Sequence, residues 1–197
     1  MGNAEWPQRM REALSRHAGE DAADEIMGGC EDLADLDEVD KSRAVKVITN
    51  RIDNLITDQE TRVKIMTDCS CRCYAEFIEE FRREYRRSQD IDKLLDAMHG
   101  KVFMVKPVRE GNVIYVTKAP RFPEKHARAS APQLKRYYYC HCDYARATKG
   151  DISRTYCLCG AGWCKRIWEQ VLERPVRVEL LKSVLQGDEI CRFAVYL

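Results

Sequence analysis

Residues 102–117 read Val-Phe-Met-Val-Lys-Pro-Val-Arg-Glu-Gly-Asn-Val-Ile-Tyr-Val-Thr, and the fold class is decided here. The runs 102–105 and 113–117 are rich in β-branched and aromatic residues, which favour strands. The segment between them, Pro107 to Asn112, supplies turn residues. We therefore predict a hairpin at this point of the chain, after a first half whose apolar residues recur at helical spacing.

Helical periodicity dominates before Gly100. Residues 5–18 and 21–28 are predicted helices that end at Gly28 and Gly29. From Lys41 onward apolar residues recur three and four positions apart, with a break near Asp58. A further helix is expected from Cys71 to Arg87, and a last one, capped by Ser88 or Asp90, ends before Gly100.

The C-terminal half mixes helix and strand. Residues 118–134 are rich in Pro, Ala, Lys and Arg and predict a loop. A helix should follow Gly162 and stop at Pro175, and two strands, Val176 to Val184 and Cys191 to Leu197, should close the chain. The predicted fold class is α+β, with N-terminal helices (1–100) packed on a C-terminal antiparallel sheet with one late helix (101–197), together forming one integrated domain.

Composition limits the cellular context. A chain of 197 residues with 45% hydrophobic residues can bury its own core, so its ten cysteines are not needed as disulfide staples. The first residues carry no basic segment followed by an apolar one, which predicts a cytoplasmic protein with reduced thiols. No apolar run approaches the roughly 18 residues that span a bilayer, so no membrane partner is expected.

The net charge of +1 hides an asymmetry. Residues 1–100 carry 15 Lys and Arg against 23 Asp and Glu, and residues 101–197 carry 18 against 9. The two halves therefore have net charges of −8 and +9. Opposite charges of this kind can join two parts of a chain or pair subunits into a homodimer. We do not expect nucleic-acid binding, because the basic residues are scattered rather than massed on one helix and Tyr137 to Tyr139 are more simply part of a strand.

Two Cys-x-Cys pairs carry the main chemical signal. Cys140 and Cys142 follow three tyrosines, and Cys157 and Cys159 follow Thr155 and Tyr156. In strands each pair points to one face, and opposed residues on paired strands approach within about 5 Å, so four sulfurs could meet one metal ion. The alternative is that the four thiols are simply buried, since free cysteine is among the most buried residue types.

A second thiol group reads Cys69-Ser70-Cys71-Arg72-Cys73, between two predicted helices. A helix N-terminus and Arg72 would stabilise thiolates here, and Cys71 and Cys73 could also complete a metal site. Cys69 is the member of the group that we most expect to have no chemical role. Cys164 is expected to lie on a buried helical stripe.

The closing segment supports a family resemblance. It consists of Gly162-Trp163, a helix, Val176 to Glu179, and then Gly187-Asp188-Glu189-Ile190-Cys191-Arg192-Phe193. Together these elements resemble the end of 4-vinyl reductase domains. The segment is also similar to the C-terminus of the L-2-amino-thiazoline-4-carboxylic acid hydrolase-like family, within an uncharacterised cysteine-rich prokaryotic group. The resemblance implies an α+β module that binds small molecules, with Cys191 as a zinc ligand and Glu179 as a weaker one. This chain departs from the zinc pattern because Ser183 stands where a cysteine would be expected.

Together these observations predict a small-molecule-binding protein with a cysteine-rich metal site. The candidate ligands are Cys140, Cys142, Cys157, Cys159, Cys191, Cys71 and Cys73, and the expected metal is zinc, with an iron–sulfur cluster as the alternative. The rival function is a hydrolase that acts on a small cyclic or amide substrate through a cysteine nucleophile or a bound metal. No catalytic residue is assigned, since nothing in the spacing selects a cysteine–histidine pair.

Overall fold

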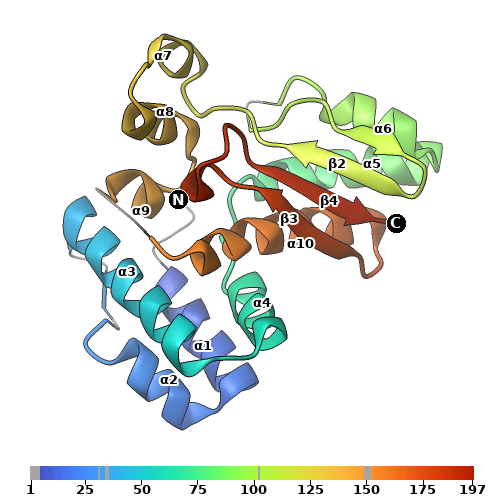
Figure 1. Ribbon diagram of the computed structural model, residues 1–197. Coiled ribbons are helices and arrows are strands. Elements are labelled where there is room, and N and C mark those ends of the chain that lie inside the picture. The colour runs from blue at the N-terminus through green and yellow to red at the C-terminus, as the bar shows by residue number, and fades with distance from the viewer. Residues whose placement is uncertain (1–4, 31, 34–35, 102, 149–151) are drawn as a thin grey trace. The chain divides into compact units, whose positions relative to one another are not determined.

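A four-stranded antiparallel sheet forms late in the chain, after a series of helices. The computed structural model (Figure 1) describes residues 5–30, 32–33, 36–101, 103–148 and 152–197. The predicted α+β class, with helices first and an antiparallel sheet near the C-terminus, is confirmed. Within the described ranges, every helix is too short or too polar to cross a lipid bilayer.

The chain divides into two compact units, each built from two separate segments. Unit 1 comprises Met1–Arg72 and Cys142–Gly162, and unit 2 comprises Cys73–His141 and Trp163–Leu197. The boundary predicted at residue 100 lies inside unit 2. Because Cys140 and Cys142 fall on opposite sides of a unit boundary, this division bears directly on the predicted thiol cluster.

Unit 1 is helical. Its elements are α1 (Trp6–Ala18), α2 (Glu20–Met27), α3 (Glu38–Leu55), α4 (Gln59–Asp68), α9 (Asp143–Ala147), the 3-10 turn η2 (Arg154–Cys157) and the start of α10 (Leu158–Leu172). Aspartates cap two of these helices: Asp37 accepts from the backbone of Asp40 at the start of α3, and Asp58 accepts from Thr61 in α4. Helix α1 packs against α2 and α4, and α3 packs against α9. These N-terminal helices agree with the predicted ones within a few residues.

Unit 2 carries the sheet. Its helices are η1 (Ala75–Phe77), α5 (Ile78–Ser88), α6 (Ile91–Met98), α7 (Pro123–Arg128), α8 (Pro132–Tyr139), the remainder of α10 and η3 (Val184–Gln186). The strands are β1 (Val108–Glu110), β2 (Val113–Thr117), β3 (Arg177–Lys182) and β4 (Arg192–Tyr196), in the order β1-β2-β4-β3. Residues Phe193 to Val195 of the inner strand β4 are all buried.

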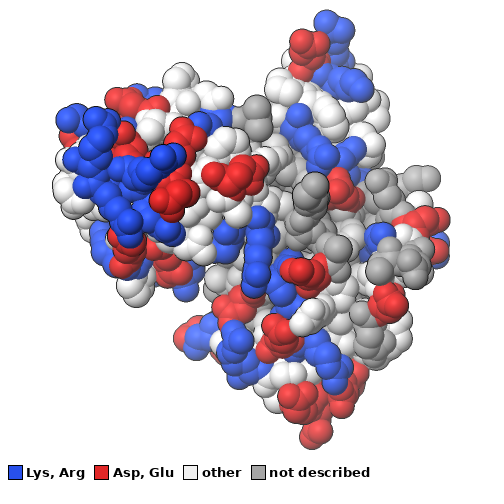
Figure 2. Space-filling view, turned by 180° about the vertical axis from the view of Figure 1, so that it is seen from behind, with Lys and Arg blue, Asp and Glu red and all other residues white. Residues whose placement is uncertain are grey.

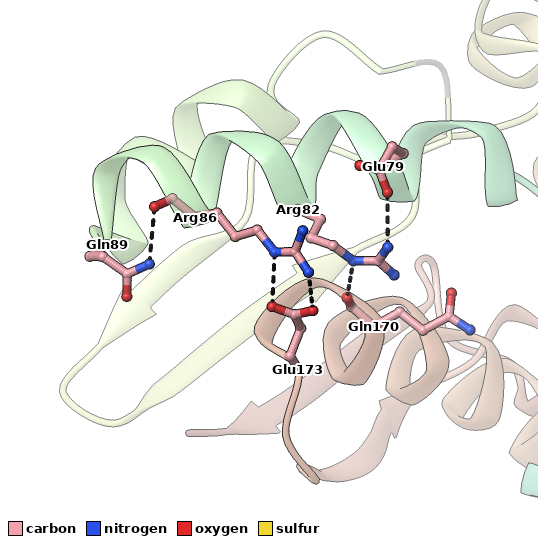
Figure 3. A network of polar contacts seen from close by, with 6 residues as sticks. All are labelled: Glu79, Arg82, Arg86, Gln89, Gln170 and Glu173. Atoms are coloured by element: carbon pink, nitrogen blue, oxygen red, sulfur yellow. Dashed lines mark hydrogen bonds and ion pairs between the residues drawn. The ribbon is translucent and has the colours of Figure 1, made fainter.

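Helices α5 and α10 lie side by side in unit 2 (Figure 3). Arg82 donates from Nε to the backbone oxygen of Gln170, and Arg86 pairs with the carboxylate of Glu173. Both residues of the second pair are about half exposed, so that pair contributes little to stability. The apolar faces of the two helices, including Phe81 and Trp168, supply the buried core of this unit.

The predicted hairpin forms, but with a shifted first strand. β1 begins at Val108 instead of Val102, and Met104 makes only an isolated bridge to Lys118. Gly111 has φ +59 at the turn, a left-handed backbone that glycine adopts freely. Val102, the first residue of the predicted strand, lies outside the described residues.

The prediction that the two Cys-x-Cys pairs lie in strands is wrong. Pro132 stands in the first turn of α8, which runs through all three tyrosines and ends at Cys140. Gln133 to Arg136 are good helix formers, and they outweigh the strand preference of the tyrosines. Cys157 ends a 3-10 turn and Cys159 lies in the first turn of α10. The loop predicted over 118–134 likewise contains α7 and the start of α8.

The helix predicted from Cys71 begins later. Tyr74 has φ +62, a left-handed conformation that interrupts a helix, and η1 and α5 follow it. Cys71 and Cys73 therefore lie before the helix start, without the stabilising position predicted for them.

Candidate functional site

Four thiols of unit 1 gather from three separate segments of the chain. Cys69 caps the C-terminal end of α4, Cys71 follows it, Cys142 precedes α9, and Cys159 lies in the first turn of α10. Cys69 and Cys71 lie close enough to Cys159 to raise its pKa, and Cys71 and Cys159 likewise raise the pKa of Cys142. We call these four residues the thiol cluster.

A glycine brings α10 to the end of α4. A Cβ placed on Gly162 would lie 2.6 Å from Thr67 Cα and 2.8 Å from Ser70 Cβ, distances that no side chain tolerates. Only glycine permits this approach. Since Cys159 lies one turn before Gly162, the close contact sets the Cys159 thiol against the residues that follow α4.

An aspartate on α3 holds the segment that leads into α10. Asp53 accepts hydrogen bonds from the hydroxyls of Ser153 and Thr155, the latter at 2.5 Å, and pairs with Arg62 at 3.3 Å. Ser153 Oγ in turn accepts from the backbone N–H of Thr155 at 3.0 Å and caps η2. These bonds fix Tyr156 and Cys159, which follow directly.

Aromatic side chains enclose the cluster. Tyr156 is buried, and its hydroxyl donates to the sulfur of Cys142 at 2.8 Å. The buried ring of Trp6 meets the rings of Tyr156 and Tyr144 edge-on, with centroids 6.2 and 6.0 Å apart. These rings therefore cover one side of Cys142; Cys69 is buried, whereas Cys71, Cys142 and Cys159 are partly exposed.

Two thiols of the cluster, Cys142 and Cys159, have raised pKa values. The hydrogen bond that Cys159 donates to Cys69, together with burial, raises the pKa of Cys159 well above its ordinary value. Burial also raises the pKa of Cys142 from 9.0 to about 11, against the opposing effect of the Tyr156 hydroxyl. Burial and the neighbouring sulfurs raise the pKa of Tyr156. Neutral thiols are thus the stable form at neutral pH.

The remaining bonds of Cys69 point back into α4 and α1. Its thiol donates to the backbone oxygen of Met66 at 3.4 Å, and its own backbone oxygen accepts from Arg9 Nε at 3.5 Å. Arg9 is 8% exposed. Cys69, the thiol for which no chemical role was expected, is therefore the direct partner of Cys159.

The four sulfurs do not form a preassembled metal site. Among the described residues, no three or more side chains of His, Cys, Asp and Glu stand in an arrangement that could hold a metal ion. A metal at the thiol cluster would require its side chains to converge and lose their protons.

The predicted ligands are split between the two units. Cys71, Cys142 and Cys159 belong to the thiol cluster, and Cys157 lies in the same unit at the end of η2. In unit 2, Cys140 is buried at the end of α8, and the backbone oxygen of Cys73 accepts from Trp163 Nε1 at 3.1 Å.

The hairpin of the family resemblance places Ser183 beside Cys191. The Ser183 hydroxyl donates to the Cys191 sulfur, while burial raises the pKa of that thiol. Lys118 opposes this rise, so its ammonium lies close to the sulfur, and it also lies 4.3 Å from the centre of the Trp163 ring. A cation already stands at this site, which disfavours a metal ion there. Glu179 is occupied by Tyr196, whose hydroxyl donates to it at 2.5 Å.

Activated nucleophiles are not found among four of the cysteines. The pKa is raised for Cys142, Cys159, Cys191 and Cys164, the last to about 12 by burial. A nucleophilic cysteine requires the opposite shift, toward the thiolate. His141 is committed elsewhere, since its ring nitrogens lie 2.7 Å from the Tyr74 hydroxyl and 2.8 Å from the backbone oxygen of Ala119.

Part of the chain is similar to a known protein family. Residues 129–197 are similar to DUF6144, a family of unknown function. The matched part includes Cys142 and Cys159, and it begins after Cys69 and Cys71 in the sequence. No curated protein matches the chain, and no solved structure matches it.

Proposed function

We propose that this protein binds a zinc ion through the thiol cluster, Cys69, Cys71, Cys142 and Cys159. The observation that carries the proposal is that four thiols from three segments lie near one another inside one unit, with Cys159 hydrogen-bonded to Cys69. Four cysteine sulfurs are the ligand set of closed structural zinc sites. With no position left for water, such a site would tie α4, α9 and α10 together.

Electrostatics supports a cation at this place. Besides burial, Cys159 and Cys71 raise the pKa of Cys142, and Cys69 and Cys71 raise the pKa of Cys159. A divalent ion would reverse this repulsion and deprotonate the sulfurs. Zinc binding should therefore release protons at neutral pH. The small-molecule ligand predicted from the sequence stays a prediction.

The test is the metal content of the full-length protein, purified without added metal, and of four single variants. We expect about one zinc per chain in the wild type, with loss of zinc in Cys69→Ser and Cys159→Ser. Cys157→Ser and Cys30→Ser are the matched controls, because both residues lie in unit 1 outside the cluster, and they should keep the metal. Less than half an equivalent of zinc in the wild type, or equal loss in all four variants, contradicts the proposal.

Cobalt substitution gives an independent readout. Tetrahedral thiolate coordination produces intense thiolate-to-cobalt charge-transfer absorption, which should weaken in each cluster variant and persist in both controls. A cobalt spectrum without charge-transfer bands would show that oxygen or nitrogen atoms hold the ion.

The hydrogen-bonded pair Cys159 and Cys69 favours a second candidate, a redox dithiol. Here two thiols would form one disulfide and pass two electrons and two protons to hydrogen peroxide, which becomes two waters. Peroxide treatment of the metal-free protein followed by peptide mapping distinguishes the candidates. A Cys69–Cys159 disulfide in a protein that never binds zinc would favour the redox function.

A further inference from the structure

Helices α7 and α8 form a basic hairpin, defined here as residues 118–138. The two helices pack against each other (Figure 1), and the backbone N–H of Phe122 donates to the oxygen of Tyr138 at 3.0 Å. The hairpin carries six Lys and Arg residues and one acidic residue, Glu124. It is therefore a local concentration of positive charge within the basic half of the chain.

Three exposed positive charges of the hairpin have no acidic partner among the residues that the structure describes. Lys125, Arg128 and Lys135 are exposed, and within the described ranges no carboxylate forms an ion pair with any of them. Helix α5 gives the contrast: Arg82, Arg86 and Arg87 each pair with a glutamate, two of these pairs being drawn in Figure 3. Figure 2 shows basic and acidic side chains interleaved over the end of unit 2 that carries α5 and α6.

Aromatic rings stand among the unpaired cations. Tyr137 is 36% exposed, and its ring meets that of Tyr138 edge-on at 5.4 Å between centroids. The Lys125 ammonium lies 5.6 Å from the centre of the Phe122 ring and 6.0 Å from that of Tyr138. Cations beside exposed aromatic faces are the combination that holds single-stranded nucleic acid, with phosphates on the cations and bases stacked on the rings.

We propose that the basic hairpin binds single-stranded nucleic acid, with phosphates at Lys125, Arg128 and Lys135 and a base stacked on Tyr137. The expectation against nucleic acid relied on Tyr137 to Tyr139 forming part of a strand and on scattered basic residues. The structure places the tyrosines on helix α8 and gathers the cations on one helical hairpin. Both grounds for that expectation are thereby removed.

A membrane surface fits these residues less well. An interfacial helix needs a broad apolar face beside its basic one. The large apolar side chains that the hairpin exposes are Leu134 and Tyr137, and α7 and α8 are six and eight residues long. Charge and aromatic rings, rather than apolar area, are what this surface offers a partner.

The first test measures binding of the full-length protein to fluorescein-labelled oligothymidylate and oligouridylate by fluorescence anisotropy, over a range of salt concentrations. The combined variant Lys125→Glu, Arg128→Glu, Lys135→Glu should bind at least tenfold more weakly. For this variant, the slope of log affinity against log salt concentration should be less steep by about 2, since each contact to a single-strand phosphate contributes about 0.7 to the slope.

The matched control carries the same charge change on other exposed residues of unit 2: Arg83→Glu, Lys93→Glu, Arg174→Glu. It should bind more tightly than the hairpin variant by at least fivefold. Equal weakening in both variants would mean that net charge alone drives binding, and the proposal would be wrong. Circular dichroism and melting curves verify that both variants are folded.

The second test separates stacking from charge. Tyr137→Ala should weaken binding about tenfold, whereas Tyr137→Phe, which keeps the ring, should bind within twofold of the wild type. An unchanged Tyr137→Ala would overturn the stacking contact. Absence of oligonucleotide binding at low salt, or tighter binding to phosphatidylserine vesicles or to polyglutamate than to either oligonucleotide, would overturn the proposal as a whole.

Discussion

Gly162 of α10 meets the backbone of Thr67 at the end of α4 with no room for a side chain. A Cβ at position 162 would stand 2.6 Å from Thr67 Cα, and backbone cannot move aside as a flexible side chain can. This single contact places the first turn of α10, with Cys159, against Cys69. The thiol cluster depends on it.

Gly162→Ala should therefore lower the free energy of unfolding by about 1–3 kcal/mol, the cost of overpacking. The sign of the change in stability is informative, because without the close contact alanine would stabilise the helix by about 1 kcal/mol relative to glycine. Urea denaturation followed by circular dichroism measures it. Lys165→Ala on the same helix is the control and should change stability by less than about 0.5 kcal/mol. A stabilised Gly162→Ala variant would show that α10 does not approach α4 this closely.

Asp53→Ala should destabilise unit 1 by about 2 kcal/mol. The substitution removes the carboxylate that accepts from the hydroxyls of Ser153 and Thr155, and hydrogen bonds to a charged acceptor are worth more than neutral ones. Asp40→Ala is the comparison, since the Asp40 carboxylate makes an exposed pair with Arg43. Thermal melting of both variants gives the difference, and equal melting temperatures would contradict the anchoring role of Asp53.

The metal-free protein should lose stability between about pH 9 and pH 11. The pKa of Cys142 is about 11 in the folded protein against 9.0 ordinarily. Within this window the unfolded chain has released the proton and the folded chain still holds it, so stability falls as pH rises. Below pH 9 both forms are protonated and the contribution is constant.

For Cys142 alone the total loss is about 3 kcal/mol. Since other groups titrate at high pH, the informative quantity is the difference between the wild type and Cys142→Ala, measured by urea denaturation at each pH. The variant should lose less stability across the window. Parallel curves for the two proteins would mean that the Cys142 thiol is not buried.

Tyr156→Phe should weaken zinc binding about tenfold while leaving one zinc per chain. The Tyr156 hydroxyl donates to Cys142 and favours its ionised form, and residues that support a metal ligand typically contribute 10–100-fold in affinity. Competition with a chromophoric chelator gives the affinity. Tyr85→Phe in unit 2 is the control, and an unchanged affinity for Tyr156→Phe would remove the tyrosine from the site.

Periodicity was enough to predict the helices of the first half, because apolar residues at helical spacing and aspartate caps act locally. The pattern of tyrosines before Cys140 misled, since strand preference in aromatic residues depends on a neighbouring strand that does not exist there. Cys71, Cys142 and Cys159 were all candidate ligands from the sequence, and the structure places them in one unit. That Cys69 joins them could not be found from spacing, because Cys69 lies more than 70 residues from Cys142 in sequence and the contact at Gly162 brings α10 to it.

X-ray absorption at the zinc edge of the full-length protein tests the central claim most directly. The account predicts a single shell of four sulfur atoms at about 2.3 Å, the distance typical of zinc–thiolate bonds. A shell of nitrogen or oxygen atoms at about 2.0–2.2 Å, or a protein that retains no zinc at all, would contradict it.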